Sequence, residues 1–216
     1  MNYWPSLVTG LADLTTPLNN ILKTMGKKGQ EVAKAMYNAT GTVTHHNTDM
    51  WGDSAPQDDY LLGTFWPMGA TWMITHVIEH FRFTGDKKAL RDMYPTLKGV
   101  AQFGLDFLTP HKGYMVTNPS SSPENGFLVP GGATGQSAAV TAGPTIDNEL
   151  LWEVFSFIPE AQEALGIKDD AFAKKVTDMK AKLPPMRINQ YGGIAEWMEN
   201  FEEVCCTLVG VFVNPS

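Results

Sequence analysis

The chain has 216 residues, of which 43% are hydrophobic, so it is long enough to bury a sizeable core. Its formal net charge of -7 and the lack of any run of five basic residues argue against a nucleic acid or an anionic membrane as a partner. No apolar stretch reaches the roughly 18 residues of a membrane span, and adjacent cysteines such as Cys205 and Cys206 rarely form a disulfide, so we expect none to hold the fold.

Apolar residues recur at helical spacing through most of the chain. From Ser6 to about Lys23 they are three, four or seven positions apart, which predicts a helix with a break or a first turn at Pro17. Alternating strand patterns are almost absent, so the sequence predicts an all-α fold. The further predicted helices are Lys28–Tyr37, Pro67–Phe83, one capped by Asp86 and ending near Tyr94, Thr96–Leu108, one capped by Thr145 or Asp147, and Asp169–Leu183.

Polar and glycine-rich segments separate these helices. One of them, His111–Gly143, is predicted to be a long loop, and long loops within compact domains are usually functional or mobile. A second segment runs from His45 to Gly52, and a third begins at Gly192 and contains Ala195–Trp197. We expect the catalytic and binding residues of the protein to lie in these loops.

The segment Asn118–Phe127 places a single acid, Glu124, in a loop with two prolines that restrict the backbone and three serines that can hydrogen bond to it. A carboxylic acid held in such a loop suits proton delivery. The alternative is a loop carboxylate that only caps a backbone amide, because exposed glutamates are common.

The segment His45–Gly52 combines two imidazoles, an amide, a carboxylate and an indole, which are the usual groups that hold a sugar. Its alternative interpretation is a capped, buried turn, because Asn and Asp often hydrogen bond to their own backbone. A metal site is the minority interpretation, since zinc needs three or four convergent ligands. His76 and His80 lie one helical turn apart, but the order His-Glu-x-x-His is absent, so we interpret them as core or supporting residues.

Several of these segments resemble the family 95 glycoside hydrolases, whose principal activity is the cleavage of α-L-fucosides. Pro119–Asn125 is similar to the proline- and serine-rich segment around the family's general acid, and His45–Gly52 is similar to a segment that faces its sugar pocket. Further similar segments follow in the family's order, so that the resemblance runs from Met1 to about Glu203: Met1–Pro5, Trp66–Gly69, Glu79–Gly85, Tyr94–Pro95 and Thr145–Asn148.

The resemblance implies a partial (α/α)6 barrel, a toroid of six helical hairpins, over residues 1–203, followed by an atypical tail at 204–216. It implies an inverting hydrolase of terminal α-L-fucosyl residues that acts on fucosylated oligosaccharides or glycans and needs no cofactor or metal. In the family an asparagine, polarised by an aspartate, positions the attacking water. Glu124 is then the general acid, and the implied substrate contacts are His46, Asn47, Asp49, Trp51 and Asn125.

Three further expectations concern the chain as a central piece of a catalytic domain. The asparagine and aspartate of the family fall outside the sequence, so we expect the chain alone to be weakly active or inactive. Apolar faces beside missing hairpins would favour self-association. The alternatives are an α-L-galactosidase of the same family, a carbohydrate-binding fragment without catalysis, and a plain helical scaffold. The family is commonly secreted or periplasmic, but the sequence does not indicate a compartment.

Overall fold

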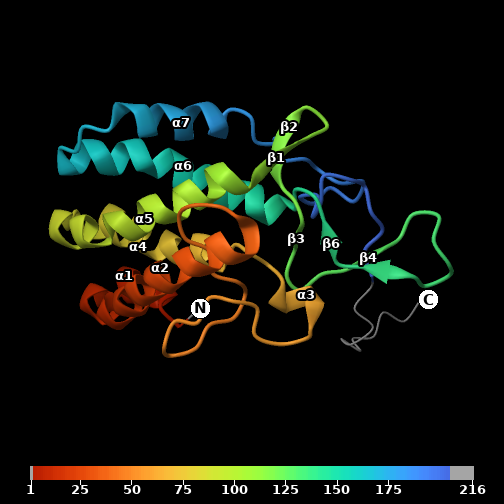
Figure 1. Cartoon of the computed structure of the whole chain (residues 1–216), viewed down its shortest axis with the longest axis horizontal. Helices are drawn as coiled ribbons and strands as arrows, with labels where there is room; N and C mark the ends of the chain where they lie inside the picture. The colour runs from red at the N-terminus through yellow and green to blue at the C-terminus, as the bar shows by residue number, and fades with distance from the viewer. Residues whose placement is uncertain (1, 205–216) are drawn as a thin grey trace.

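The computed structural model describes residues 2–204 (Figure 1). The chain is predominantly helical, which confirms the all-α prediction. The tail predicted at 204–216, with both cysteines, lies outside the described residues except for Val204. The elements are α1 (Trp4–Val8), the 3-10 helix η1 (Ala12–Thr15), α2 (Thr16–Tyr37), α3 (Leu61–Thr64), α4 (Gly69–Thr84), α5 (Lys87–Phe107), β1 (Leu108–His111), β2 (Tyr114–Thr117), β3 (Ser120–Ser121), β4 (Phe127–Leu128), β5 (Ser137–Ala138), β6 (Val140–Thr141), α6 (Thr145–Leu165) and α7 (Asp170–Lys180).

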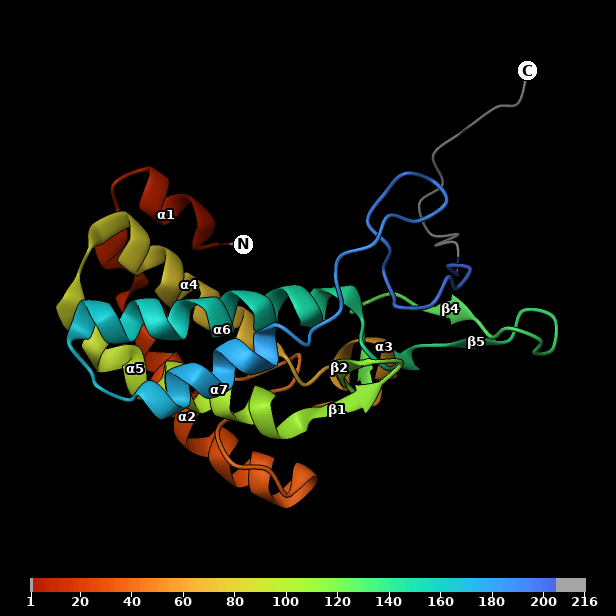
Figure 2. The same cartoon turned by 90° about the horizontal axis from the view of Figure 1, so that it is seen from above.

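The long helices form two layers. Helices α4 and α6 lie in one layer, and α2, α5 and α7 lie in the other (Figure 2). The hairpins α4–α5 and α6–α7 each cross from one layer to the other, which is the arrangement expected of part of an (α/α)6 barrel. Within residues 2–204, no helix combines the length and the hydropathy needed to cross a bilayer.

The core fills the space between these layers. Burying each large apolar side chain contributes about 1.5–3 kcal/mol, so the packing between the two helical layers is the main source of the stability of the fold. The largest side chains with almost no exposure are Leu22, Met25, Met68, Ile74, Ile78, Leu90, Met93, Leu97, Phe103, Leu151, Phe155 and Phe157.

Two predicted helix breaks are wrong. The helix predicted from Ser6 to about Lys23 is divided into α1, η1 and the start of α2, and from Thr16 the chain continues through Lys28 as the single helix α2, with Pro17 in its first turn. Gly26 and Gly29 let neighbouring segments pack closely against this helix, so it continues where a break was predicted. The helices predicted on either side of Pro95 form the single helix α5. A proline inside a helix costs about 3 kcal/mol, but the buried residues before and after Pro95 share one face, and their burial outweighs that cost.

The predicted caps are partly confirmed. The Asp86 carboxylate accepts hydrogen bonds from the amides of Lys88 and Ala89 at the start of α5. The cap predicted for α6 is wrong, because Pro144 occupies the N-cap position. The Thr145 hydroxyl instead donates to the carbonyl of Ala195, and Asp147 is buried.

The loop predicted over His111–Gly143 contains short strands. Strand β1 pairs with β2 through a turn at Lys112 and Gly113, both of which have positive φ, as a two-residue hairpin requires. Strand β3 pairs with β6, and β4 pairs with β5, over two residues each. Strands this short show no alternating pattern, so the sequence gives no signal for them.

At Gly69, the first residue of α4, the helix packs directly against the predicted sugar-binding segment. A Cβ atom placed on Gly69 would lie only 2.2 Å from the His45 carbonyl oxygen. We expect Gly69→Ala to lower the free energy of unfolding by about 1–3 kcal/mol, because either α4 or the His45 segment must shift. Gly63→Ala is the matched control: its nearest neighbours would lie at 3.5 Å, an ordinary contact, so we expect a change within about 0.5 kcal/mol. Denaturant unfolding of both variants tests this, and equal stability of Gly69→Ala and the unaltered chain would contradict it.

Candidate active site

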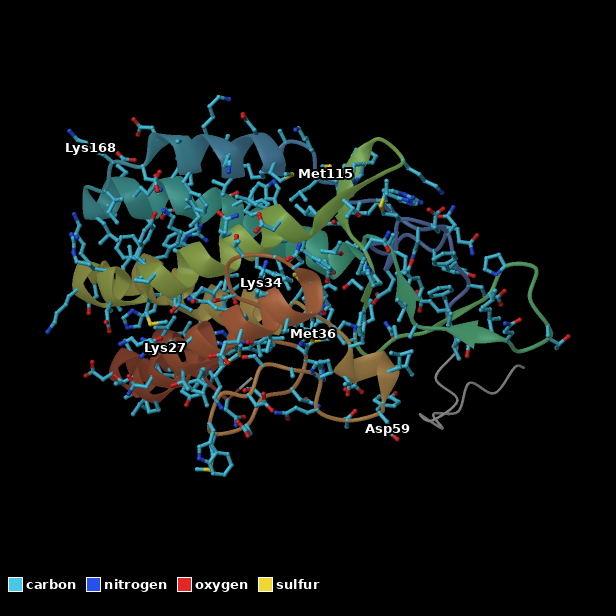
Figure 3. All side chains as sticks on the ribbon, in the orientation of Figure 1. Lys27, Lys34, Met36, Asp59, Met115 and Lys168 are labelled. Atoms are coloured by element: carbon cyan, nitrogen blue, oxygen red, sulfur yellow. The ribbon has the colours of Figure 1, made fainter. Side chains whose placement is uncertain are left out.

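Three connecting segments meet at one end of the helical layers. They are residues 38–68 between α2 and α4, 108–144 between α5 and α6, and 181–204 after α7. Figure 3 shows Asp59 of the first segment at this end and Lys168, in the turn between α6 and α7, at the opposite end. Helices α4 and α6 both begin at the end with the three segments, so the positive ends of their dipoles point toward it.

Glu124 lies in a tight turn of the second segment. The amide of Asn125 donates to the carbonyl of Ser122 at 2.7 Å, which places Glu124 in the third position of a four-residue turn. Its side chain is 52% exposed, and Oε1 lies 3.8 Å from Nε2 of His46. That separation is too long for a hydrogen bond, and within residues 2–204 no hydrogen bond to the Glu124 carboxylate forms. The carboxylate is therefore accessible, and no hydrogen bond from residues 2–204 competes for it.

The two histidines of the first segment have different surroundings. His45 is buried, and its ring nitrogens lie 2.6 Å from the Tyr37 hydroxyl and 2.8 Å from the Ser54 carbonyl oxygen. Burial lowers the pKa of His45, which favours a neutral ring that supports the loop. His46 is half-buried, lies edge-on to the Trp66 ring and faces Glu124. Of the two, only His46 reaches the acid.

The other predicted substrate contacts lie around this pair in different ways. Asn125 belongs to the Glu124 turn, and its amide donates to Oε1 of Glu196 at 3.0 Å. Asn47, next to His46, donates to Asp58 at 3.4 Å. Asp58 is held in turn by Thr64, whose hydroxyl bond is the largest cause of its lowered pKa.

Asp49 and Trp51 belong to a turn of the first segment for which no contact with Glu124 is found within residues 2–204. The Asp49 carboxylate accepts the amides of Asp53 and Trp51 at 3.0 and 2.9 Å, and these bonds lower its pKa, the Asp53 bond being the larger cause. The turn that it stabilises leaves Trp51 66% exposed, and the following residue, Gly52, packs against α2 near Thr24. In the part of the chain that the structure describes, no hydrogen bond or ring contact joins Trp51 to His46 or Glu124.

Asp147 is a residue of this end that the predicted site omits. It is fully buried, and its two oxygens accept from Nε1 of Trp66 at 2.7 Å and from the Thr117 hydroxyl at 2.6 Å. Through Trp66 it supports His46, which in turn faces Glu124. Burial raises the pKa of Asp147 to about 6, although these hydrogen bonds partly oppose the rise. Its spacing of four residues from buried Leu151 is a signal that could have placed it on the buried face of α6.

Glu196 is a second omitted residue. Its Oε1 atom accepts hydrogen bonds from the hydroxyl of Ser122 and the amide of Asn125, which lie on either side of Glu124 in the chain. Next to it, Trp197 borders a cleft of about 600 Å³ between α6 and residues 184–187, and none of the predicted site residues lines this cleft. No sequence spacing indicates the bonds of Glu196, because they join residues 71 and 74 positions apart.

The described residues contain no group of three His, Cys, Asp or Glu side chains that could hold a metal ion. Nδ1 of His76 lies 3.3 Å from the carbonyl oxygen of Met73, one turn earlier in α4. Burial is the largest cause of the lowered pKa of His76. This ring therefore has a local partner.

Comparisons with known proteins agree with the resemblance of these segments. The family model described as the glycosyl hydrolase family 95 catalytic domain matches residues 1–206. Alpha-L-fucosidase 2 of Arabidopsis thaliana is 39% identical over 205 residues, which are 94% of this chain and 24% of that protein. Probable alpha-fucosidase A of Aspergillus niger is 34% identical over 206 residues, 91% of this chain and 25% of that protein. The chain thus spans about a quarter of the length of these relatives.

The raised pKa of Asp147 predicts a pH dependence of stability. Between its unfolded value of 3.8 and its folded value of about 6, the folded chain binds the extra proton, so stability falls as pH rises through this window. The loss approaches about 3 kcal/mol above pH 6, at about 1.4 kcal/mol per pKa unit. Asp147→Asn removes this titration.

We therefore expect the stability of Asp147→Asn relative to the unaltered chain to rise between pH 4 and pH 7. Denaturant unfolding at several pH values measures it. Asp86→Asn is the control, because hydrogen bonds, of which that from Ala89 is the largest cause, lower the pKa of exposed Asp86 below 3.8. Its stability relative to the unaltered chain should therefore change mainly below pH 4 and stay nearly constant between pH 4 and pH 7. A pH-independent difference between Asp147→Asn and the unaltered chain would contradict the assignment.

Proposed function

Because the chain belongs to the glycosyl hydrolase family 95 catalytic domains, we propose that it forms the acid-bearing part of a hydrolase of terminal α-L-fucosyl residues. The substrates would be fucosylated oligosaccharides or glycoconjugates. The printed names of the two relatives, an alpha-L-fucosidase and a probable alpha-fucosidase, support this substrate class. Since the chain spans about a quarter of their length, the proposal concerns the whole protein.

The observation that carries the proposal is the free carboxylate of Glu124. A carboxyl group that already accepts hydrogen bonds must break them before it can turn to a substrate. Asp49, Asp58 and Glu196 at the same end all accept such bonds, whereas Glu124 accepts none within residues 2–204. Its side chain is exposed, stands on a closed turn and lies beside His46. We assign it as the general acid.

The acid would act on the oxygen that leaves the fucosyl residue. As the bond between this oxygen and the anomeric carbon breaks, Glu124 donates its proton to the oxygen, and the sugar develops oxocarbenium character. A water molecule attacks the anomeric carbon from the opposite face and gives up a proton to a general base of the whole protein, so the configuration inverts.

The remaining predicted residues would hold the sugar. His46, Asn47 and Asn125 lie on the two segments nearest to the acid and offer polar groups to the hydroxyls of the sugar. Trp51 offers an exposed indole as a platform for the apolar face of a sugar, and Asp49 shapes the turn that presents it. The roles of His46, Asn47 and Asn125 rest on the resemblance and on placement together, whereas those of Trp51 and Asp49 rest on the resemblance alone.

Replacing the acid tests this function. We expect Glu124→Gln in the whole protein to lower kcat for an α-L-fucosyl disaccharide by about 10²- to 10⁴-fold, the usual contribution of a general acid, with little change in stability. Glu31→Gln, an exposed glutamate on α2, is the matched control and should leave kcat unchanged. Full activity of Glu124→Gln would contradict the assignment. Fucose binding by the unaltered protein without hydrolysis would favour the alternative of a carbohydrate-binding protein.

The stereochemistry of the product tests the inverting mechanism separately. Proton NMR during hydrolysis by the whole protein should show β-L-fucose as the first product, before mutarotation mixes the anomers. Spontaneous mutarotation of purified fucose in the same buffer is the control. If α-L-fucose forms first, the enzyme retains configuration, and a nucleophilic carboxylate must take the place of the attacking water.

A further inference from the structure

The turn that carries Glu124 is closed twice, once by its backbone and once by side chains. The backbone closure is the bond from the Asn125 amide to the Ser122 carbonyl at 2.7 Å. The side chains of the same two residues then donate to one atom, Oε1 of Glu196, which Asn125 reaches at 3.0 Å. Both corners of the turn are therefore fixed relative to a single carboxylate oxygen.

Glu196 is itself held firmly. Its carbonyl oxygen accepts the amide of Thr145 at 3.0 Å, at the first residue of α6. Its two neighbours in the chain, Ala195 and Trp197, are buried, and Trp197 packs edge-on against Phe127 just after the turn. Hydrogen bonds to an ionised acceptor are about twice as strong as neutral ones. The turn is thus fixed to the first residue of α6 through Glu196, which accepts the hydrogen bonds from Ser122 and Asn125. The ring contact between Trp197 and Phe127 adds a second attachment.

We propose that Glu196 is a positioning residue, which aligns the carboxyl of Glu124 with the leaving oxygen of the substrate without touching the substrate itself. This inference rests on the proposed function of Glu124 as the general acid. A displacement of about 1 Å in a catalytic group can lower the rate by 10²-fold, so a turn that carries the acid benefits from being fixed at both corners.

The alternative is that Glu196 only stabilises the fold. Comparing substrates with different leaving groups distinguishes this structural role from a positioning role. A nitrophenolate is a good leaving group and needs little protonation, whereas a sugar alkoxide leaves only when an acid protonates it. Misalignment of the acid therefore slows hydrolysis of a disaccharide far more than that of a nitrophenyl fucoside. General damage to the fold slows both equally.

The experiment compares variants of the whole protein on a nitrophenyl α-L-fucoside and an α-L-fucosyl disaccharide. We expect Glu196→Ala to lower kcat for the disaccharide by about 10- to 100-fold, with less than about threefold effect on the nitrophenyl substrate and on KM. Glu196→Gln keeps an acceptor oxygen and should restore most of the disaccharide rate. Glu199→Ala is the control from the same segment, because its carboxylate accepts from Lys112 at 2.6 Å instead, and it should leave both rates unchanged.

The outcomes separate the inference from the function on which it rests. Equal losses on both substrates, full activity of Glu196→Ala, or no rescue by Glu196→Gln would overturn the positioning role while leaving Glu124 as the acid. If the unaltered protein hydrolyses neither fucoside, the proposed function fails, and the positioning role fails with it. A leaving-group dependence that appears equally in Glu199→Ala would also overturn it, since Glu199 is not hydrogen-bonded to the turn.

Discussion

The buried carboxylate of Asp147 is the interaction on which the site depends. It joins three parts of the chain that are distant in sequence: the first turn of α6, the segment before α4 through Trp66, and β2 through Thr117. A buried carboxylate is unfavourable unless it is hydrogen-bonded, so the structure must supply both donors. The position of the Trp66 ring follows from this requirement, and the ring of His46 packs against it.

The helical framework could be predicted because its signals are local. Spacing of apolar residues indicates α4, and the residues around Asp86 and Asp169 identify two helix starts correctly. The breaks predicted near Lys28 and at Pro95 are wrong because local preference disagrees with packing there. Buried faces continue through both positions, and the free energy of burying them exceeds the local penalty.

The candidate site could be predicted only in part, for the same reason. Glu124 and His46 stand in segments of unusual composition, which left a capping carboxylate and a capped turn open, and the resemblance of these segments to the family selected them. Their approach to 3.8 Å, and the contacts of Glu196 with Ser122 and Asn125, depend on how three loops meet after the helices pack. For Asp49 the sequence alone could not decide, because an aspartate in such a segment suits a sugar contact as well as a turn. In the structure its carboxylate accepts hydrogen bonds from the backbone of its own turn.

Glu124 differs from its acidic neighbours in the hydrogen bonds that its carboxylate accepts, because the hydrogen-bond donors near it are directed at those neighbours. Backbone amides and hydroxyls near this end are directed at Asp49, Asp58, Asp147 and Glu196, and each of these carboxylates thereby shapes a loop or joins two segments. A carboxylate that fixes structure in this way is poorly suited to deliver a proton to a substrate, because its hydrogen bonds would have to break in each catalytic cycle. Glu124 accepts no such bond within residues 2–204, yet its backbone is fixed through Ser122 and Asn125. The fold therefore holds the acid in position through its neighbours and leaves its carboxyl group free to react.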